Sequence, residues 1–124
     1  MHKQFEVIVN ILPLLTTMEE GFKHIKQQLA ELRYEEAFVM LGDVVQGMTI
    51  VENALATIEN TLKALQNDTV RQSKLDLNRS IYSTVKLYEN RNYQELDNAV
   101  EATTHAFMAW KKCVEKIIRP RVTS

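Results

Sequence analysis

The chain has 124 residues, of which 45% are hydrophobic and 25% are charged, and it contains 3 glycines and 2 prolines. This length fits one globular domain, and so few glycines and prolines favour long helices over strands. The net charge is −1, without the basic excess that nucleic-acid binding requires, so we expect no nucleic-acid partner.

The first predicted element is an amphipathic helix over residues 4–32. Pro13 lies inside its apolar pattern without changing the phase, so we expect one kinked helix; a short separate helix ending near Leu12 is the alternative. The apolar residues recur in alternating steps of three and four, the period of one helix face, at Phe5, Ile8, Leu12, Leu15, Met18, Phe22, Ile25, Leu29 and Leu32.

The second predicted helix spans residues 35–65. Gly42 and Gly47 lie inside it at a cost in helix propensity, which predicts a close helix approach or a local bend there. Asp68 or Thr69, in the turn that follows, is expected to cap the third helix. The apolar stripe of the second helix is nearly unbroken, at Ala37, Leu41, Val44, Met48, Val51, Leu55, Ile58, Leu62 and Leu65.

The third and fourth helices are predicted over residues 69–90 and 94–118. The fourth ends before Pro120, which cannot continue it, and residues 119–124 are expected to form a loose tail. Basic residues gather at this end of the chain, where cations complement a helix C-terminus; they are Lys111, Lys112, Lys116, Arg119 and Arg121.

Two turns of the chain, at residues 33–35 and 91–94, resemble each other, and we call them the inner turns. Arg33-Tyr34-Glu35 and Arg91-Asn92-Tyr93-Gln94 each end one apolar-periodic segment and begin another, which indicates two copies of a helical hairpin. One hairpin cannot cover its own apolar stripe, whereas two together enclose a core. We therefore predict an all-α, antiparallel up-down-up-down four-helix bundle as a single domain over residues 1–124, with the rings of Tyr34 and Tyr93 closing the bundle end.

Two carboxylate and imidazole pairs are candidates for a metal site. Glu20 precedes His24 by four residues and Glu101 precedes His105 by four, which places each pair on one helix face. A metal-binding bundle built on these residues, with Asp43 as a further ligand, is one alternative. Because carboxylate-bridged bundles use Glu-x-x-His pairs, which this chain lacks, we expect solvated pairs. No nucleophile or phosphate-loop motif is present, so we predict neither enzyme activity nor a cofactor.

Surplus apolar residues on the first two helices are the candidate partner-binding surface. A bundle seam needs about two apolar residues in seven, and both helices exceed that number. A core face wider than two residues in seven would bury these extra apolar residues. Otherwise they would bind a protein partner or a second copy of the chain. These residues are Val7, Leu14, Phe38, Val39, Met40, Val45 and Ile50.

Cellular location is indicated by three features. Cys113 is the single cysteine and cannot form an intrachain disulfide, so we expect a small buried thiol and a reducing compartment. Glu6 and Asn10 interrupt the apolar N-terminal stretch, and no small-residue cleavage site follows it. No uninterrupted apolar run is long enough for a membrane span. We therefore predict a cytoplasmic protein without membrane contact.

With its repeated Arg-Tyr-Glu and Arg-Asn-Tyr-Gln turns and the helix that reaches Trp110, the chain resembles small uncharacterised helical-bundle proteins of Gram-positive bacteria. This resemblance implies the fold and no known activity. In length and helical architecture the chain is also similar to the flagellar export chaperones, which bind apolar segments of secreted subunits. A chaperone that binds a partner helix is therefore an alternative function.

Overall fold

A computed structural model describes residues 2–123. Four long helices form the molecule: α1 (His2–Ala30), α2 (Tyr34–Ala56), α3 (Asp68–Glu89) and α4 (Leu96–Ile118). The 3₁₀ turns η1 (Lys63–Gln66) and η2 (Tyr93–Glu95) precede α3 and α4, and the short helix α5 (Pro120–Thr123) follows α4. No strand occurs within residues 2–123, and the predicted all-α, four-helix fold is confirmed.

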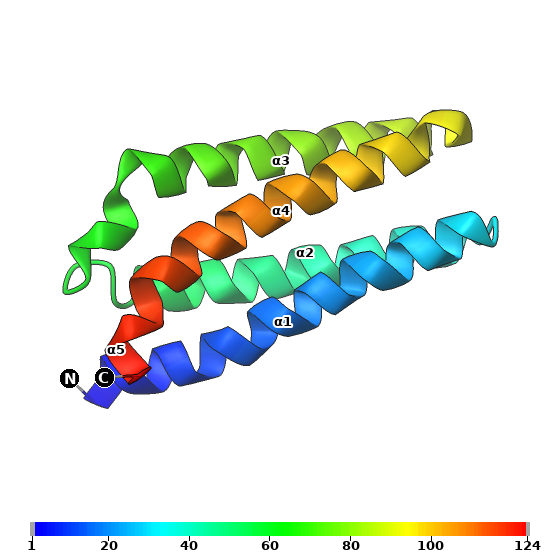
Figure 1. The fold of residues 1–124 in the computed structure, drawn as a ribbon. Coiled ribbons are helices and arrows are strands. Elements are labelled where there is room, and N and C mark those ends of the chain that lie inside the picture. The colour runs from blue at the N-terminus through cyan, green and yellow to red at the C-terminus, as the bar shows by residue number, and fades with distance from the viewer. Residues whose placement is uncertain (1, 124) are drawn as a thin grey trace.

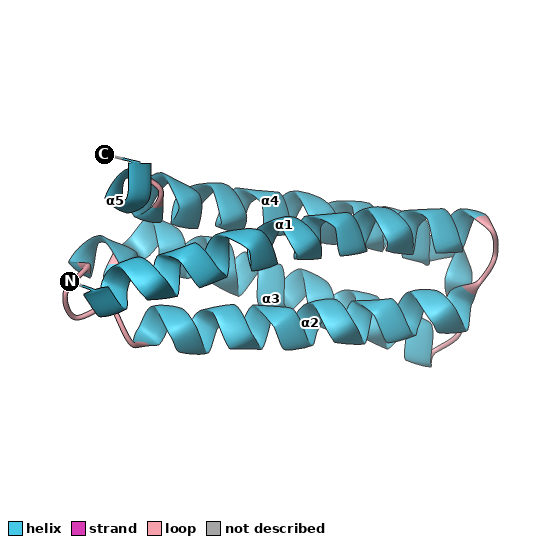
Figure 2. Cartoon of the chain, turned by 90° about the horizontal axis from the view of Figure 1, so that it is seen from below, coloured by secondary structure: helices cyan, strands magenta, loops and turns pink. Residues whose placement is uncertain are grey.

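The four helices are arranged as two hairpins, α1 with α2 and α3 with α4 (Figure 1). The hairpins meet mainly along α1 and α4, where the ring centroids of Phe22 and Phe107 lie 5.1 Å apart. The backbones of α2 and α3 approach each other less closely, so long side chains bridge the space between them. Loops occur only near the two ends of the bundle (Figure 2).

The core follows the predicted stripe of the second helix throughout, and that of the first helix with three exceptions. Ile11 is fully buried, whereas Leu12, which was predicted in the stripe, is half-buried on the flank of the helix. Phe5 is 52% exposed and Leu32 is 70% exposed, so both predictions of burial were wrong. Leu32 is exposed because α1 ends at Ala30 and Leu32 belongs to the turn that follows. The helical period applies only where the backbone is helical.

Pro13 does not divide α1, which is one continuous helix from His2 to Ala30. The alternative of a separate helix ending near Leu12 is therefore wrong. Pro13 is exposed, so its ring lies on the solvent side of the helix, where water can satisfy the carbonyl that loses its helical donor. The hydroxyl of Thr17 also donates a hydrogen bond to the Pro13 carbonyl at 3.0 Å.

α2 ends at Ala56, nine residues before the predicted end at Leu65. Threonine hydroxyls bond to nearby carbonyls here, from Thr57 to Ala54 at 2.6 Å and from Thr61 to Ile58 at 3.0 Å. Such local bonds compete with the helical ladder. The prediction of burial nevertheless holds, because the apolar residues of this segment cover the end of the core; they are Ile58, Leu62 and Leu65.

Two further helix ends differ from prediction. The N-cap of α3 is Asn67 rather than Asp68 or Thr69, and its Oδ1 accepts the N–H of Val70 at 2.8 Å. Residues 120–123 form α5 rather than a loose tail. Pro120 opens this helix, a position where the missing N–H of proline costs nothing, and Val122 packs against the core.

The two inner turns have the same backbone structure, which supports the predicted duplication. Leu32 (φ 61°) and Arg91 (φ 58°) both adopt the left-handed conformation. In each turn, this residue donates its N–H to the carbonyl three residues earlier, and the next residue donates to the carbonyl five residues earlier, at 2.8 to 3.0 Å. This pattern is the Schellman motif, whose left-handed position favours glycine.

Replacing Leu32 by glycine is expected to raise the free energy of unfolding by about 0.5 to 1 kcal/mol, because a Cβ atom strains the left-handed conformation. Little packing is lost, since Leu32 is 70% exposed. Urea denaturation followed by circular dichroism measures the change. The Leu32→Ala control keeps the Cβ atom and is expected to gain nothing; an equal gain in both variants would contradict the strain argument.

The α1–α2 contact depends on glycine. A Cβ atom placed on Gly21 would lie 2.7 Å from Cγ2 of Val44, and one on Gly47 would lie 3.1 Å from Sδ of Met18. Gly47 therefore confirms the predicted close helix approach. Gly42 does not, because no other atom lies within 4 Å of its Cβ position. Gly21, which the sequence analysis did not select, makes the closest approach of the three.

α2 also has the length and mean hydropathy of a helix that could cross a membrane, and it is the only helix within residues 2–123 that does. Core helices of soluble bundles share these properties. The absence of a membrane span stays a prediction.

Candidate functional site

Five of the seven predicted partner-binding residues take part in packing within the bundle. These five are half-buried; they are Val7, Leu14, Phe38, Met40 and Val45. All except Phe38 pack against the buried core cluster. The wider core face that the sequence offered as an alternative therefore accounts for most of the surplus.

Val39 and Ile50 are the two predicted residues that point to solvent, with exposed fractions of 64% and 52%. They are eleven residues apart on α2, close to three helical turns, so their side chains project from the same side of the helix. Gly42 and Asp43, both exposed, lie between them along the helix. This outer face of α2, defined by Val39, Gly42, Asp43 and Ile50, is the candidate interaction surface.

The outer face of α2 is acidic as well as apolar. α2 contains four acidic residues and no lysine or arginine. Asp43 belongs to the outer face, whereas Glu52 pairs with Lys74 of α3 and Glu36 pairs with Arg33. Nearby charges of one sign attract a partner of the opposite sign and speed its association. The surface is therefore suited to an apolar partner segment that carries basic residues.

An aromatic cluster closes the end of the bundle where the two inner turns meet. The rings of Tyr34 and Tyr93 stack with centroids 4.3 Å apart, and Phe38 stacks on Tyr88 at 4.1 Å with an interplanar angle of 5°. The predicted role of both tyrosines in closing the bundle end is confirmed. Because each stack joins one hairpin to the other, the cluster holds the two hairpins together.

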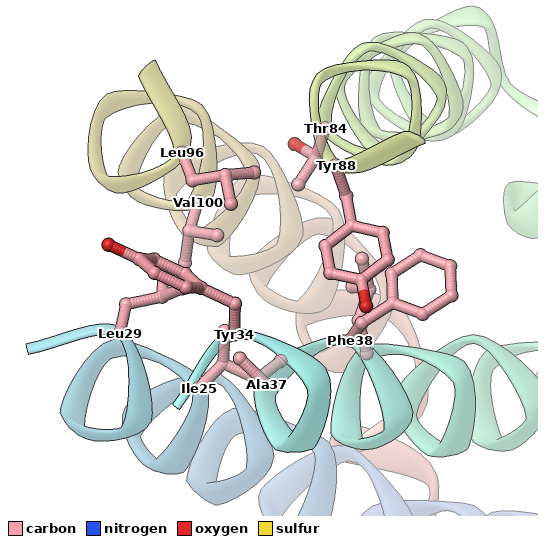
Figure 3. Close-up of a pocket in the computed structure, with 10 residues that line it drawn as sticks. Ile25, Leu29, Tyr34, Ala37, Phe38, Thr84, Tyr88, Leu96 and Val100 are labelled. Carbon is pink, nitrogen blue, oxygen red and sulfur yellow. The ribbon is translucent and has the colours of Figure 1, made fainter. Parts of the chain in front are cut away.

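Figure 3 shows the small cavity beneath this cluster, with Phe38 of α2 beside Tyr88 of α3 and the ring of Tyr34 on the side of Leu96 and Val100 of α4. Its volume is about 20 Å³, roughly the space of one water molecule. The lining is almost entirely apolar, and the Thr84 hydroxyl is already engaged, at 3.0 Å from Thr103 Oγ1 and 2.9 Å from the Ser80 carbonyl. We infer a packing defect rather than a ligand site.

The buried hydroxyl groups between α3 and α4 form a closed network. Thr103 is 1% exposed; its hydroxyl contacts that of Ser80 at 2.7 Å and donates to the Ala99 carbonyl at 2.8 Å. No base or acid takes part in these contacts, so nothing here activates a hydroxyl as a nucleophile. The network stabilises the α3–α4 hairpin, because buried polar groups need partners.

The residues of the metal-site alternative are not brought together. Glu20, His24, Asp43, Glu101 and His105 are all exposed. Glu101 pairs instead with Lys26, at 3.4 Å. Among the described residues, no three His, Cys, Asp or Glu side chains form a group that could hold a metal ion.

Charged side chains in and beside the turn between α1 and α2 shift one another's pKa values. The pKa of Arg33 is raised by hydrogen bonds to the carboxylates of Glu36 and Glu31. The pKa of Glu31 is lowered, mainly by its hydrogen bond from Arg33 and then by the one from Gln27. All four side chains are exposed, so solvent screens these contacts and they add little to stability.

One of the basic residues near the C-terminus of the chain, Lys111, is largely buried. Nζ of Lys111 lies 3.3 Å from Glu19 on α1 and 3.2 Å from Glu115 on α4, and only 12% of its side chain is exposed. Lys111 therefore links α1 to α4 as well as lying near a helix C-terminus. Cys113 is half-buried rather than fully buried as predicted.

A cleft between α2 and α3 is the feature that the sequence analysis missed. Trp110 and Lys74 line it together with Glu52. In the sequence neither residue carries a signal on its own, because a tryptophan and a lysine are both common on the helices of a bundle. Only the looser packing of α2 against α3 brings them to one site.

A family model described as a domain of unknown function, DUF8042, matches residues 6–113. No curated protein and no solved structure matches the chain.

Proposed function

The chain belongs to the DUF8042 family of domains of unknown function, and for this member we propose a non-enzymatic role in protein–protein contact in the cytoplasm. The observation that supports the proposal is the outer face of α2, where Val39 and Ile50 remain 64% and 52% exposed. Surface apolar residues that serve no internal packing are typical of interaction sites when they share one face.

Gly42 adds a second argument. A glycine inside a helix costs up to about 1 kcal/mol relative to alanine, and beyond the adjacent residues and backbone of α2 itself, nothing lies within 4 Å of the Gly42 Cβ position. The internal packing therefore gives no reason for glycine here. A partner backbone approaching this face of α2 would give one, because glycine allows close contact.

Site-specific photo-crosslinking in the cells that naturally produce the chain tests the proposal. A benzoylphenylalanine residue replaces Val39 on the outer face of α2 or, as the control, Leu75 on α3, which is 49% exposed. We expect a discrete crosslinked product from position 39 only, since the partner covers α2. A product the size of two chains would identify a homodimer, and a product with another protein would identify a partner such as an exported subunit.

Equal labelling from both positions, or no product from position 39, would contradict the proposal. The Val39→Glu and Ile50→Glu double variant provides the complementary measurement. We expect it to keep the melting temperature of the original chain and to lose the crosslink from a probe at Asp43, because two new charges oppose an apolar, acidic interface.

A further inference from the structure

A cleft with a volume of about 170 Å³ lies between α2 and α3, and the ring of Trp110 is part of its lining. This volume is comparable with the cavity of about 150 Å³ that holds benzene in an engineered protein. The apolar walls come from Leu55 at the end of α2 and Val70 at the start of α3. The cleft can therefore take a short apolar chain of several atoms.

Trp110 contributes its ring to the wall of the cleft. The side chain is 2% exposed, and its indole N–H donates to no acceptor among the described residues. The N–H itself is open to water, because among the described residues the one buried side-chain polar atom without a partner is Oε1 of Gln28. An oxygen acceptor of a bound partner can take the place of this water.

The positive charges of the cleft are already paired. Nζ of Lys74 lies 2.8 Å from a carboxylate oxygen of Glu52, and it also donates to Oδ1 of Asn78 at 2.7 Å. Arg71 pairs with Asp68 at 3.7 Å. No cation of the cleft therefore lacks a counterion.

The remaining negative charge of the cleft has no partner. Glu59 lines the cleft and is half-buried, and it makes no hydrogen bond or ion pair with the described part of the chain. A partly buried carboxylate gains most from a cation held against it out of bulk water. The unmatched charge of the cleft is thus one carboxylate, beside an apolar wall.

We propose that this cleft binds a lysine or arginine side chain of a partner protein. The aliphatic stem lies against Leu55, Val70 and the Trp110 ring, the charged head pairs with Glu59, and a carbonyl of the same partner accepts the Trp110 N–H. The inference rests on the proposed protein–protein role, and it specifies the anchor residue of the partner. The exposed carboxylate of Asp43 on α2, a helix without lysine or arginine, favours the same class of partner; Glu36 and Glu52 are already paired with Arg33 and Lys74.

The indole N–H signal of Trp110 makes the test direct, because the chain contains one tryptophan. The ¹⁵N-labelled protein is titrated with N-acetyl-lysine methylamide and, separately, with N-acetyl-norleucine methylamide, which has a similar stem and no charge. We expect the lysine compound to shift the indole cross-peak saturably, with a dissociation constant on the order of millimolar. The norleucine compound is expected to bind at least about tenfold more weakly, as a lost charge-assisted contact requires.

Two variants assign the charged contact. Glu59→Gln is expected to reduce the affinity for the lysine compound about tenfold or more. Glu6→Gln, which changes an exposed carboxylate on α1, is the matched control and is expected to leave the affinity unchanged. Unfolding curves of both variants show whether the bundle is intact.

No saturable indole shift, equal binding of the two compounds, or unchanged affinity in Glu59→Gln would each overturn the proposal. These outcomes are independent of the crosslinking at Val39. A crosslinked product from position 39 without lysine binding would support the role in protein–protein contact and reject the binding of a basic side chain in the cleft. Lysine binding without any crosslinked product would support the cleft and reject the outer face of α2.

Discussion

Replacing Phe38 by glutamate is expected to lower the free energy of unfolding by about 3 kcal/mol, the largest loss among the substitutions considered. The Phe38 ring stacks on Tyr88 at 4.1 Å and lines the apolar cavity between the hairpins. The change removes this ring contact, which is one of the few that join α2 to α3, and it places a charge against an apolar wall. Thermal unfolding followed by circular dichroism should show a midpoint lower by roughly 10 °C.

The neighbouring substitution Val39→Glu is the matched control, because it introduces the same charge one residue away. Val39 is 64% exposed, and surface changes of this kind usually alter stability by no more than about 0.5 kcal/mol. Equal losses in the two variants would contradict the assignment of Phe38 to the contact between α2 and α3 and of Val39 to the surface. A soluble, fully stable Phe38→Glu protein would instead return Phe38 to the partner-binding surface.

Alanine substitutions at the glycines are expected to have opposite effects on stability. Gly21→Ala should lower the free energy of unfolding by about 2 kcal/mol, because its Cβ would lie 2.7 Å from a methyl group of the buried residue Val44. Gly42→Ala should raise it by about 0.5 to 1 kcal/mol, since the new methyl group meets no atom within 4 Å and alanine favours the helix.

Gly47→Ala provides an intermediate case. Its Cβ would lie 3.1 Å from Sδ of Met18, and the flexible methionine side chain can move aside. We expect a change within roughly 0.5 kcal/mol of zero, as the helix propensity gained offsets the crowding. Urea denaturation of the three alanine variants measures the order of their free energies of unfolding. Stabilisation by Gly21→Ala would show that α1 and α2 pack less closely than their backbones indicate.

The spacing of apolar residues along the chain was sufficient to predict the fold. The alternation of three and four along each apolar stripe predicted four helices, and the repeated turns at Tyr34 and Tyr93 predicted two hairpins. Both predictions depend on local chemistry, because one amphipathic face must be buried wherever it occurs. The same local signal failed at residues 57–65, where the stripe continues and threonine hydroxyl groups end the helix.

The residues of the outer face of α2 and of the cleft between α2 and α3 could be identified only from the tertiary structure. The sequence shows that α2 has more apolar residues than a bundle seam needs. It does not show which of them are exposed, because Phe38 and Val39 are adjacent and equally apolar. The orientation of α2 toward α3 decides between them, since a rotation of 100° per residue turns one inward and the next outward. Likewise, the pairing of Lys74 with Glu52 and the absence of a partner for Glu59 emerge only when the two hairpins are placed together.

The sequence by itself therefore determined the number, type and pairing of the helices, because each follows from the spacing of apolar residues and the chemistry of turns. Only the tertiary structure decided which apolar side chains stay exposed, which glycine makes close contact, and that a cleft lined by Trp110 lies between α2 and α3. These properties depend on the distance and rotation between helices far apart in the chain, which local patterns do not specify.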